Sequence, residues 1–125
     1  MKSILVIASI SGALAVMIGA FGAHGLKPIL TNYQTLDAFE KASKYHFYHT
    51  FALLFCGIWM YIFKSTETAQ IQYAAYSFLI GIVIFSGSLY TLAVTNIKIL
   101  GAITPIGGLA FIVGWFFLLL SFLKL

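Results

Sequence analysis

The chain has 125 residues, of which 62% are hydrophobic, 17% aromatic and 8% charged. A soluble domain carries about 25% charged residues, and one of this size cannot bury so much apolar surface. The composition therefore excludes a soluble enzyme domain and a disordered chain. The net charge of +4 comes from lysines dispersed between apolar runs, a pattern typical of anchors at a membrane surface. Because nucleic-acid binders concentrate cations on one face, we expect no nucleic-acid partner.

Four apolar segments follow one another along the chain. Each predicts a helix, because a backbone in lipid must satisfy its own hydrogen bonds. The predicted helices lie at about 4–22, 45–63, 71–94 and 104–123. About 20 residues are needed to cross the hydrocarbon layer, and the second segment reaches this length if its helix begins near Lys41. The sequence predicts an all-α fold, in which residues 1–125 form a single integral-membrane domain built as a four-helix transmembrane bundle.

The stretch before the second helix has the features of a short amphipathic segment at the membrane interface. Pro28 and Asn32 mark a turn, and Thr35 is predicted to be the N-cap of a new helix. Charged residues fall into two i,i+4 pairs in the favourable order, Asp37 with Lys41 and Glu40 with Lys44. The apolar residues of the segment can share one stripe: Leu36, Phe39 and Phe47. A plain loop is the alternative.

Pro105 lies at the start of the fourth segment and has two interpretations. If Thr104 caps the helix, Pro105 occupies the first helical position, where no amide hydrogen bond is lost. If the helix begins near Lys98, Pro105 kinks it. The sequence favours the cap at Thr104.

Small residues at four-residue spacing indicate how the helices pack, since lipid supplies no hydrophobic drive between them. They occur in three segments, as Ser11, Ala15, Gly19 and Ala23, as Ser77 and Gly81, and as Ala110 and Gly114. The row in the first segment favours a retained helix over a cleaved signal peptide. These faces are predicted to pack within the bundle, and homo-oligomer formation through one of them is the alternative.

Polar side chains are predicted to gather at one end of the bundle, because the first and third links lie on the same side of the membrane. The predicted cluster comprises His24, His46, His49, Ser86, Ser88 and Tyr90. Neutral imidazole is a common metal ligand and titrates near neutrality, so the three histidines could bind a metal or haem, or relay protons. Alternatively, they lie at headgroup level, hydrogen-bonded to their surroundings. No motif supports a metal site, so no cofactor is expected.

The remaining reactive groups give no catalytic constellation. Asp37, Glu40 and Glu67 all fall in predicted links, whereas ion-coupled transporters place an ionisable group at membrane depth. Cys56 lies inside an apolar run and is predicted to be a small buried hydrophobe. The hydroxyl groups are expected to form interhelical hydrogen bonds rather than to act as nucleophiles. The chain is predicted not to be an enzyme.

Four short motifs run in order along nearly the whole chain, at residues 19–26 (GAFGAHGL), 45–49 (YHFYH), 85–90 (FSGSLY) and 103–108 (ITPIGG). Together they resemble the signature of a family of small bacterial membrane proteins, the YgdD/YwdK type. The resemblance implies a multi-pass, four-helix protein of the bacterial cytoplasmic (inner) membrane. The family has no assigned function, so the resemblance transfers no catalytic residue.

Three functional hypotheses follow. The leading one is a non-enzymatic membrane protein that binds a membrane lipid or supports a membrane protein partner. The second is a small transporter or channel that acts as an oligomer, which a buried polar path through the bundle would favour. The third is a metal or haem protein that uses His24, His46 and His49, which a bound metal or haem would favour.

Overall fold

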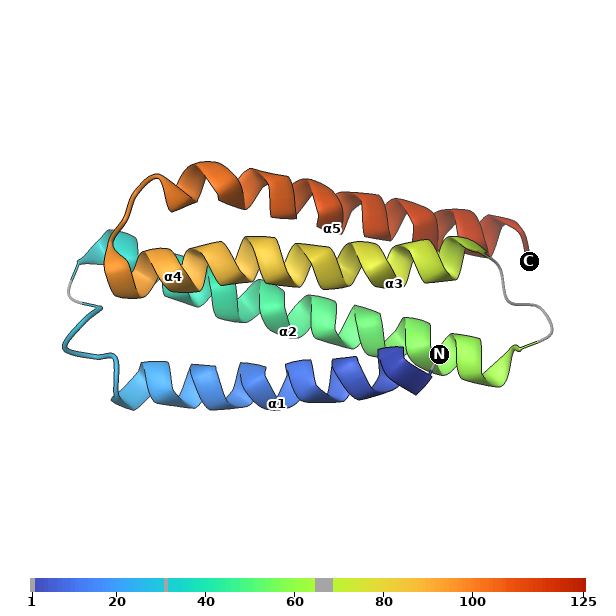
Figure 1. Ribbon diagram of the computed structural model, residues 1–125, viewed down its shortest axis with the longest axis horizontal. Helices are drawn as coiled ribbons and strands as arrows, with labels where there is room; N and C mark the ends of the chain where they lie inside the picture. Colours follow the sequence, from blue (N-terminus) through green and yellow to red (C-terminus); the bar gives the residue numbers. More distant parts are fainter. Residues whose placement is uncertain (1, 31, 65–68) are drawn as a thin grey trace.

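The computed structural model describes residues 2–30, 32–64 and 69–125, apart from the side chain of Ala23. The helices in these residues are α1 (Lys2–His24), α2 (Tyr33–Ile62), α3 (Ala69–Gly81), the π-helical turn η1 (Ile82–Ser86), α4 (Gly87–Thr95) and α5 (Leu100–Leu123). α3, η1 and α4 run on as one rod (Figure 1). The described residues therefore form four helical rods without a strand, which confirms the predicted all-α fold.

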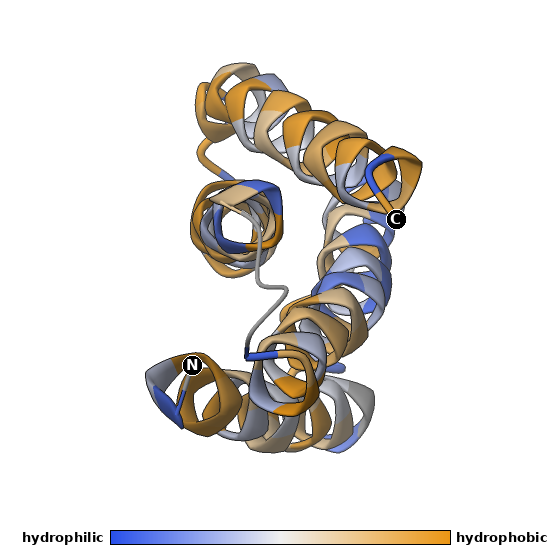
Figure 2. Ribbon diagram, turned by 90° about the vertical axis from the view of Figure 1, so that its right-hand side faces the viewer, coloured by the Kyte–Doolittle hydropathy of each residue, from blue (hydrophilic) through white to orange (hydrophobic). Residues whose placement is uncertain are grey.

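Three of these rods are long and apolar enough to cross a membrane, over Lys2–Gly22, Ala69–Thr95 and Leu100–Leu123. Figure 2 shows α1 and α5 as largely hydrophobic and α2 as richer in hydrophilic residues. α2 nevertheless packs on α1 and on the rod of α3, η1 and α4 (Figure 1). With 30 residues α2 is about 45 Å long, roughly 15 Å more than the hydrocarbon layer of a bilayer.

The predicted interfacial segment is the first part of α2 itself, because the helix is continuous from Tyr33. Asn32 is the N-cap, and its side chain accepts a hydrogen bond from the Thr35 amide at 2.8 Å. The predicted cap at Thr35 is wrong, because the backbone is already extended at Asn32 and turns helical directly after it. Thr35 is buried inside the first turn, where its hydroxyl donates to the Asn32 carbonyl at 3.1 Å.

One of the two predicted i,i+4 pairs forms. Lys41 Nζ lies 2.9 Å from the Asp37 carboxylate, and this hydrogen bond raises the pKa of the Lys41 ammonium. Glu40 and Lys44 are both exposed and form no ion pair within the described part of the chain. Glu67 lies outside the described residues.

α5 begins at Leu100, so Pro105 lies inside the helix and not at its first position. The predicted cap at Thr104 is wrong, because the first amides of α5 already donate to carbonyls three residues earlier in the link. Thr104 is instead buried against α4, and its hydroxyl lies 2.6 Å from the Ser88 hydroxyl. Since proline has no amide hydrogen, Pro105 cannot donate the usual helical bond to the carbonyl of Gly101.

The rods pack as an open row. α1 packs on α2, α2 packs on the rod of α3, η1 and α4, and α5 packs on that same rod. The links after α1 and after α4 lie at one end of the molecule, named here the link end, and both termini lie at the other, the terminal end (Figure 1). This arrangement agrees with the prediction that the first and third links share one side.

The small residues predicted for packing make close contacts between α3 and α5. A Cβ on Gly81 would overlap the Phe111 ring, and a Cβ on Gly114 would lie 2.7 Å from the Phe78 ring. Each rod therefore accommodates a phenylalanine of the other over a glycine. The other small residue of each predicted pair, Ser77 in α3 and Ala110 in α5, is half-buried.

The small-residue row of α1 faces α2. Ser11 and Ala15 are buried, and a Cβ on Gly19 would lie 3.6 Å from the Ser43 hydroxyl, an ordinary contact. A closer contact occurs at Gly22, where a Cβ would overlap the Phe39 ring. Packing of α1 on α2 near the link end thus depends more on Gly22 than on Gly19.

Candidate functional site

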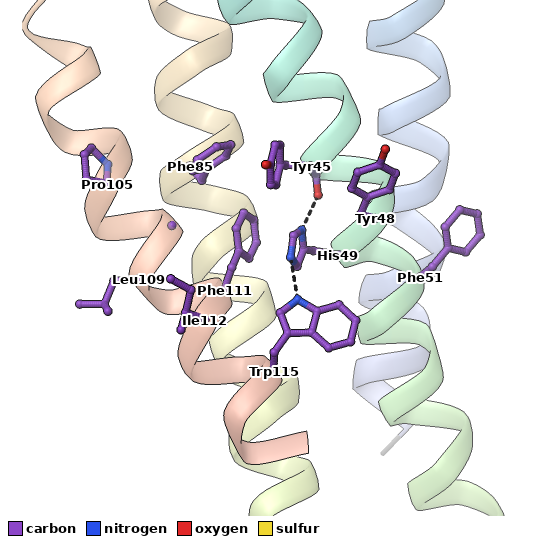
Figure 3. Close-up of a pocket in the computed structure, with 11 residues that line it drawn as sticks. Tyr45, Tyr48, His49, Phe51, Phe85, Pro105, Leu109, Phe111, Ile112 and Trp115 are labelled. Carbon is purple, nitrogen blue, oxygen red and sulfur yellow. Dashed lines mark hydrogen bonds between the residues drawn. The ribbon is translucent and has the colours of Figure 1, made fainter. Parts of the chain in front are cut away.

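A groove of about 1010 Å³ lies between α2 and α5 and is named here the α2–α5 groove. It is lined by Tyr45, Tyr48, His49, Phe51, Phe85, Pro105, Gly108, Leu109, Phe111, Ile112 and Trp115 (Figure 3). None of these described lining residues is a lysine or an acid. The rim residues Phe51, Leu109 and Ile112 are at least 60% exposed, so the groove opens on the side of the helices.

Aromatic rings form the floor of the α2–α5 groove. The His49 ring is stacked on the Phe111 ring, with centroids 3.5 Å apart and planes 10° apart. The Tyr45 ring is nearly parallel to His49, at 5.9 Å, and packs on Phe85 at 4.8 Å. The rings come from α2, η1 and α5, so they fix three rods relative to one another.

His49 is held in one neutral tautomer by its two partners (Figure 3). Its Nδ1–H donates to the Tyr45 carbonyl oxygen at 2.8 Å, because that oxygen is an acceptor and cannot donate. Trp115 Nε1–H donates to His49 Nε2 at 3.1 Å, because an indole nitrogen is a donor and cannot accept. A metal ion or an added proton at Nε2 would have to displace Trp115.

His46 belongs to a separate chain of hydrogen bonds that joins three rods. Its Nε2 lies 3.0 Å from the Ser11 hydroxyl of α1, and that hydroxyl lies 2.7 Å from the Thr50 hydroxyl of α2. Its Nδ1 lies 3.0 Å from the Tyr90 hydroxyl of α4. Ser11, His46 and Thr50 are all buried, so their mutual bonds replace hydration.

The residues predicted as one polar cluster are therefore divided among several places. His24 is exposed at the end of α1, whereas Ser11, the α1 partner of His46, lies about 20 Å further along that helix. Ser86 donates to the carbonyl of Ala42 at 2.9 Å, and Ser88 pairs with Thr104. These hydroxyl contacts are interhelical hydrogen bonds, as the sequence analysis predicts.

The arrangement of the histidines bears on the metal hypothesis. Across the described residues, no three His, Cys, Asp or Glu side chains converge on a common point. His46 and His49 direct their ring nitrogens to different partners, and His24 contacts neither of these networks. The three histidines do not build one ligand set.

The polar chain also bears on the transporter hypothesis. Within residues 2–30, 32–64 and 69–125, the series of hydrogen-bonded side chains that includes His46 extends toward the terminal end no further than Thr50. Beyond it lies an apolar cluster that includes Leu53, Cys56 and Ile71, each of them 0% exposed. The hydrogen-bonded chain through His46 therefore stops at the apolar cluster that follows it toward the terminal end.

Four residues of these networks were not predicted from the sequence to be site residues: Ser11, Thr50, Phe111 and Trp115. Thr50 follows His46 by four residues, which places the two on one helical face. The four-residue spacing of Ser11 with Ala15 predicts a packing role and does not indicate a hydrogen bond to a histidine. The partnership between Trp115 and His49 spans 66 positions and has no local signal.

The apolar rods and the laterally open groove define a helical membrane protein. The family described as "Protein of unknown function (DUF423)" matches residues 18–108 of the chain. The chain accordingly belongs to the DUF423 family, whose curated relatives are named UPF0382 membrane proteins. The resemblance described from the sequence motifs is thereby confirmed.

The relatives match over nearly their whole length. The chain is 43% identical over 124 residues to a UPF0382 membrane protein of Staphylococcus epidermidis, covering 99% of this chain and 98% of that protein. It is 43% identical over 125 residues to SSP2132 of Staphylococcus saprophyticus, covering 100% of both. It is 40% identical over 127 residues to YwdK of Bacillus subtilis, covering 99% of this chain and 98% of YwdK. No solved structure matches the chain significantly.

Proposed function

We propose that this protein is a non-enzymatic lipid-binding protein, whose α2–α5 groove holds one acyl chain of an anionic phospholipid. The observation that carries the proposal is the order of side chains along α2, from the lysines that precede the groove to the residues that line it. From the link end inward, α2 presents lysines, then tyrosines, then hydrocarbon. A phospholipid has the complementary order of phosphate, ester and acyl chain.

The polar end of this series lies on one side of α2. Lys41 and Lys44 precede Tyr45 and Tyr48 by four residues each, so each lysine stands one turn above its tyrosine. All four side chains are exposed, and the Tyr48 hydroxyl points toward the link end (Figure 3). Lys44 has no carboxylate partner among the described residues, which leaves its ammonium available to a phosphate.

The apolar end of the series is concave and rigid. The stacked rings and the bond between Trp115 and His49 hold the floor in one arrangement. A hydrocarbon chain can therefore gain dispersion contacts without ordering protein side chains. Pocket volumes for small ligands run from about 300 to 1,000 Å³, and the groove of about 1010 Å³ lies at the upper end of that range.

We place this activity in the cytoplasmic membrane of a bacterium, with α2 as a fourth crossing beside the three apolar spans. The relatives are bacterial membrane proteins. The length of α2 supports a crossing that begins near Tyr45 and leaves Lys41 and Lys44 at the headgroup level.

Gly108 offers the sharpest test, because it lines the groove and a Cβ there meets the Phe85 ring at an ordinary 3.7 Å. We expect Gly108→Leu to fill the groove and to lower retention of phosphatidylglycerol at least about fivefold, equivalent to about 1 kcal/mol. Retention is measured by native mass spectrometry of the full chain released from mixed phosphatidylglycerol and phosphatidylcholine nanodiscs.

A matched control is Gly101→Leu, at an exposed glycine of α5 outside the groove, which should retain lipid like the unchanged chain. Lys44→Gln should reduce the preference for phosphatidylglycerol over phosphatidylcholine about fivefold, since a lysine near an anionic surface contributes about 1 kcal/mol. Equal retention by the Gly108→Leu and Gly101→Leu variants would refute the proposal. A two-chain mass that the Gly108 substitution abolishes would assign the groove to a second copy instead.

A further inference from the structure

We infer that His46 is a proton-binding site inside the protein, supplied from the link end through Tyr90 and Ser43, and that His49 is not. The inference goes beyond lipid binding, and its proton-binding residue, His46, does not line the α2–α5 groove. It follows from the hydrogen-bonding roles that the partners of each imidazole can adopt.

Both ring nitrogens of His46 face hydroxyl groups, Ser11 at Nε2 and Tyr90 at Nδ1, each at 3.0 Å. A hydroxyl can donate or accept, so either neutral tautomer of His46 satisfies both bonds. The imidazolium form also satisfies them, because both oxygens can accept while Ser11 donates onward to Thr50 at 2.7 Å. Protonation of His46 therefore breaks no hydrogen bond in its surroundings.

His49 lies three residues further along the same helix and is buried to the same degree, with 5% exposure against 4% for His46. Its partners have fixed roles, because a carbonyl oxygen accepts and an indole N–H donates. A proton on Nε2 would point at the hydrogen of Trp115. The two histidines thus form a natural comparison, differing in partner chemistry and not in burial.

A route for the proton leads from His46 toward the link end. The Tyr90 hydroxyl interacts with the Ser43 side chain, and Ser43 lines a surface pocket of about 350 Å³. Glu40 and Lys44 line the same pocket, and both are exposed. A surface pocket of this size, with the polar side chains of Glu40, Ser43 and Lys44 in its wall, has room for more than one water. Solvent at the membrane surface is therefore two hydroxyl groups away from the imidazole.

The other side of His46 faces hydrocarbon. A groove of about 260 Å³ lies beside it, between α1 and the central rod, with walls that include Ile7, Ile10, Leu14 and Val83. Side chains of this kind attract lipid chains rather than water. Tyr90 and Ser43 are consequently the connection to solvent that the geometry favours.

The groups that face His46 carry no formal charge in the described part of the chain. α1 contributes Ser11, η1 contributes Ser86 to the same groove, and α4 contributes Tyr90, the titratable group in contact. The charged side chains of Glu40 and Lys44 lie at the outer end of the route, in the wall of the surface pocket. An added proton on His46 thus meets neither a cation nor a carboxylate.

The uptake step conserves protons. The Tyr90 O–H proton moves to Nδ1 of His46 in its Nε2–H tautomer, and the Tyr90 oxygen takes a replacement from the Ser43 hydroxyl. Ser43 is reprotonated by a hydronium ion in the surface pocket. The net change is one hydronium consumed and one imidazolium formed, without any redox partner.

The test is nitrogen NMR of the full chain with ¹⁵N-labelled histidine in lipid nanodiscs, between about pH 8 and pH 5, a range around the ordinary imidazole transition. His46 should move from neutral to imidazolium shifts, while His49 keeps the shifts of the Nδ1–H tautomer throughout. His24→Gln and His46→Gln assign the signals. A His46 that stays neutral, or that titrates together with His49, would overturn the inference.

Two variants test the role of the hydroxyls. Tyr90→Phe removes the acceptor for Nδ1–H and should lower the pH midpoint of His46 by about one unit or more. Tyr76→Phe, at an exposed tyrosine of α3, is the matched control and should leave the midpoint unchanged. If Tyr90→Phe fails to fold, Ser11→Ala tests the other nitrogen with the same expectation. An unchanged midpoint in a folded Tyr90→Phe or Ser11→Ala variant would also overturn the inference.

Discussion

Gly107→Ala is expected to destabilise the protein by at least about 3 kcal/mol, the upper range for overpacking a core. The added methyl would overlap the backbone nitrogen of Phe85 and lie 2.7 Å from its Cα. A backbone cannot move aside by changing a rotamer, unlike the end of a side chain. The contact therefore has to be relieved by separating α5 from η1, which also carries Ser86.

The neighbouring glycine provides the control for Gly107. At Gly108 a Cβ has its nearest neighbour in the Phe85 ring, at 3.7 Å, so Gly108→Ala should unfold like the unchanged chain. Reversible unfolding in mixed micelles, followed by circular dichroism, measures both variants. Equal stability of the Gly107→Ala and Gly108→Ala proteins would show that α5 does not approach η1 as closely as described.

Phe78→Ala is expected to cost about 3–5 kcal/mol, the range measured when a buried phenylalanine is truncated to alanine. Phe78 is 0% exposed, lies over Gly114, and contacts the Trp115 ring with centroids 5.1 Å apart. Its removal leaves a cavity between α3 and α5. Trp115 also loses a neighbour that holds its indole toward His49.

Phe116→Ala separates this effect from a general loss of aromatic surface. Phe116 is on α5 and is 56% exposed, so its truncation removes lipid-facing contacts without opening a cavity. The same unfolding measurement should give a change below about 1 kcal/mol for a surface position. A Phe78→Ala variant as stable as the Phe116→Ala variant would contradict the packing of α3 on α5.

The rods and much of their packing could be predicted from the sequence, because both depend on local patterns. Uninterrupted apolar runs require helices in lipid, and small residues at four-residue spacing mark close approach. Gly81 and Gly114 fulfil that expectation. The pattern did not reveal which residue approaches each glycine, since Phe78 and Phe111 are ordinary apolar residues in their own segments.

The errors at Thr35 and Pro105 have a common physical origin. Both predictions placed a helix start at a threonine directly before a favourable segment, the amphipathic segment for Thr35 and the fourth apolar segment for Thr104 and Pro105. In each case the helix begins earlier, with Asn32 as the N-cap of α2 and a tight turn in the link before α5. Tertiary contacts stabilise the additional turns, as the buried side chains of Thr35 and Thr104 indicate.

The residues predicted to gather at one end of the bundle lie at different depths and have different partners, for a geometric reason. The number of membrane crossings before a link, odd or even, fixes the side of the membrane on which that link lies. It does not fix how deep in the membrane a residue within a helix lies. His46 and His49 follow several turns of α2, because that helix already begins at Tyr33. They therefore lie well inside the rods, while His24 remains at the end of α1.

The sideways opening of the α2–α5 groove determines how its occupancy would respond to membrane composition. A molecule that enters from the side arrives by diffusion in two dimensions, and it always displaces another lipid. The fraction of grooves that hold a given lipid is then set by exchange with neighbouring lipids. It depends on the mole fraction of that lipid in the membrane and not on its concentration in water. A tenfold preference, about 1.4 kcal/mol, fills half of the grooves when the preferred lipid is about one molecule in eleven.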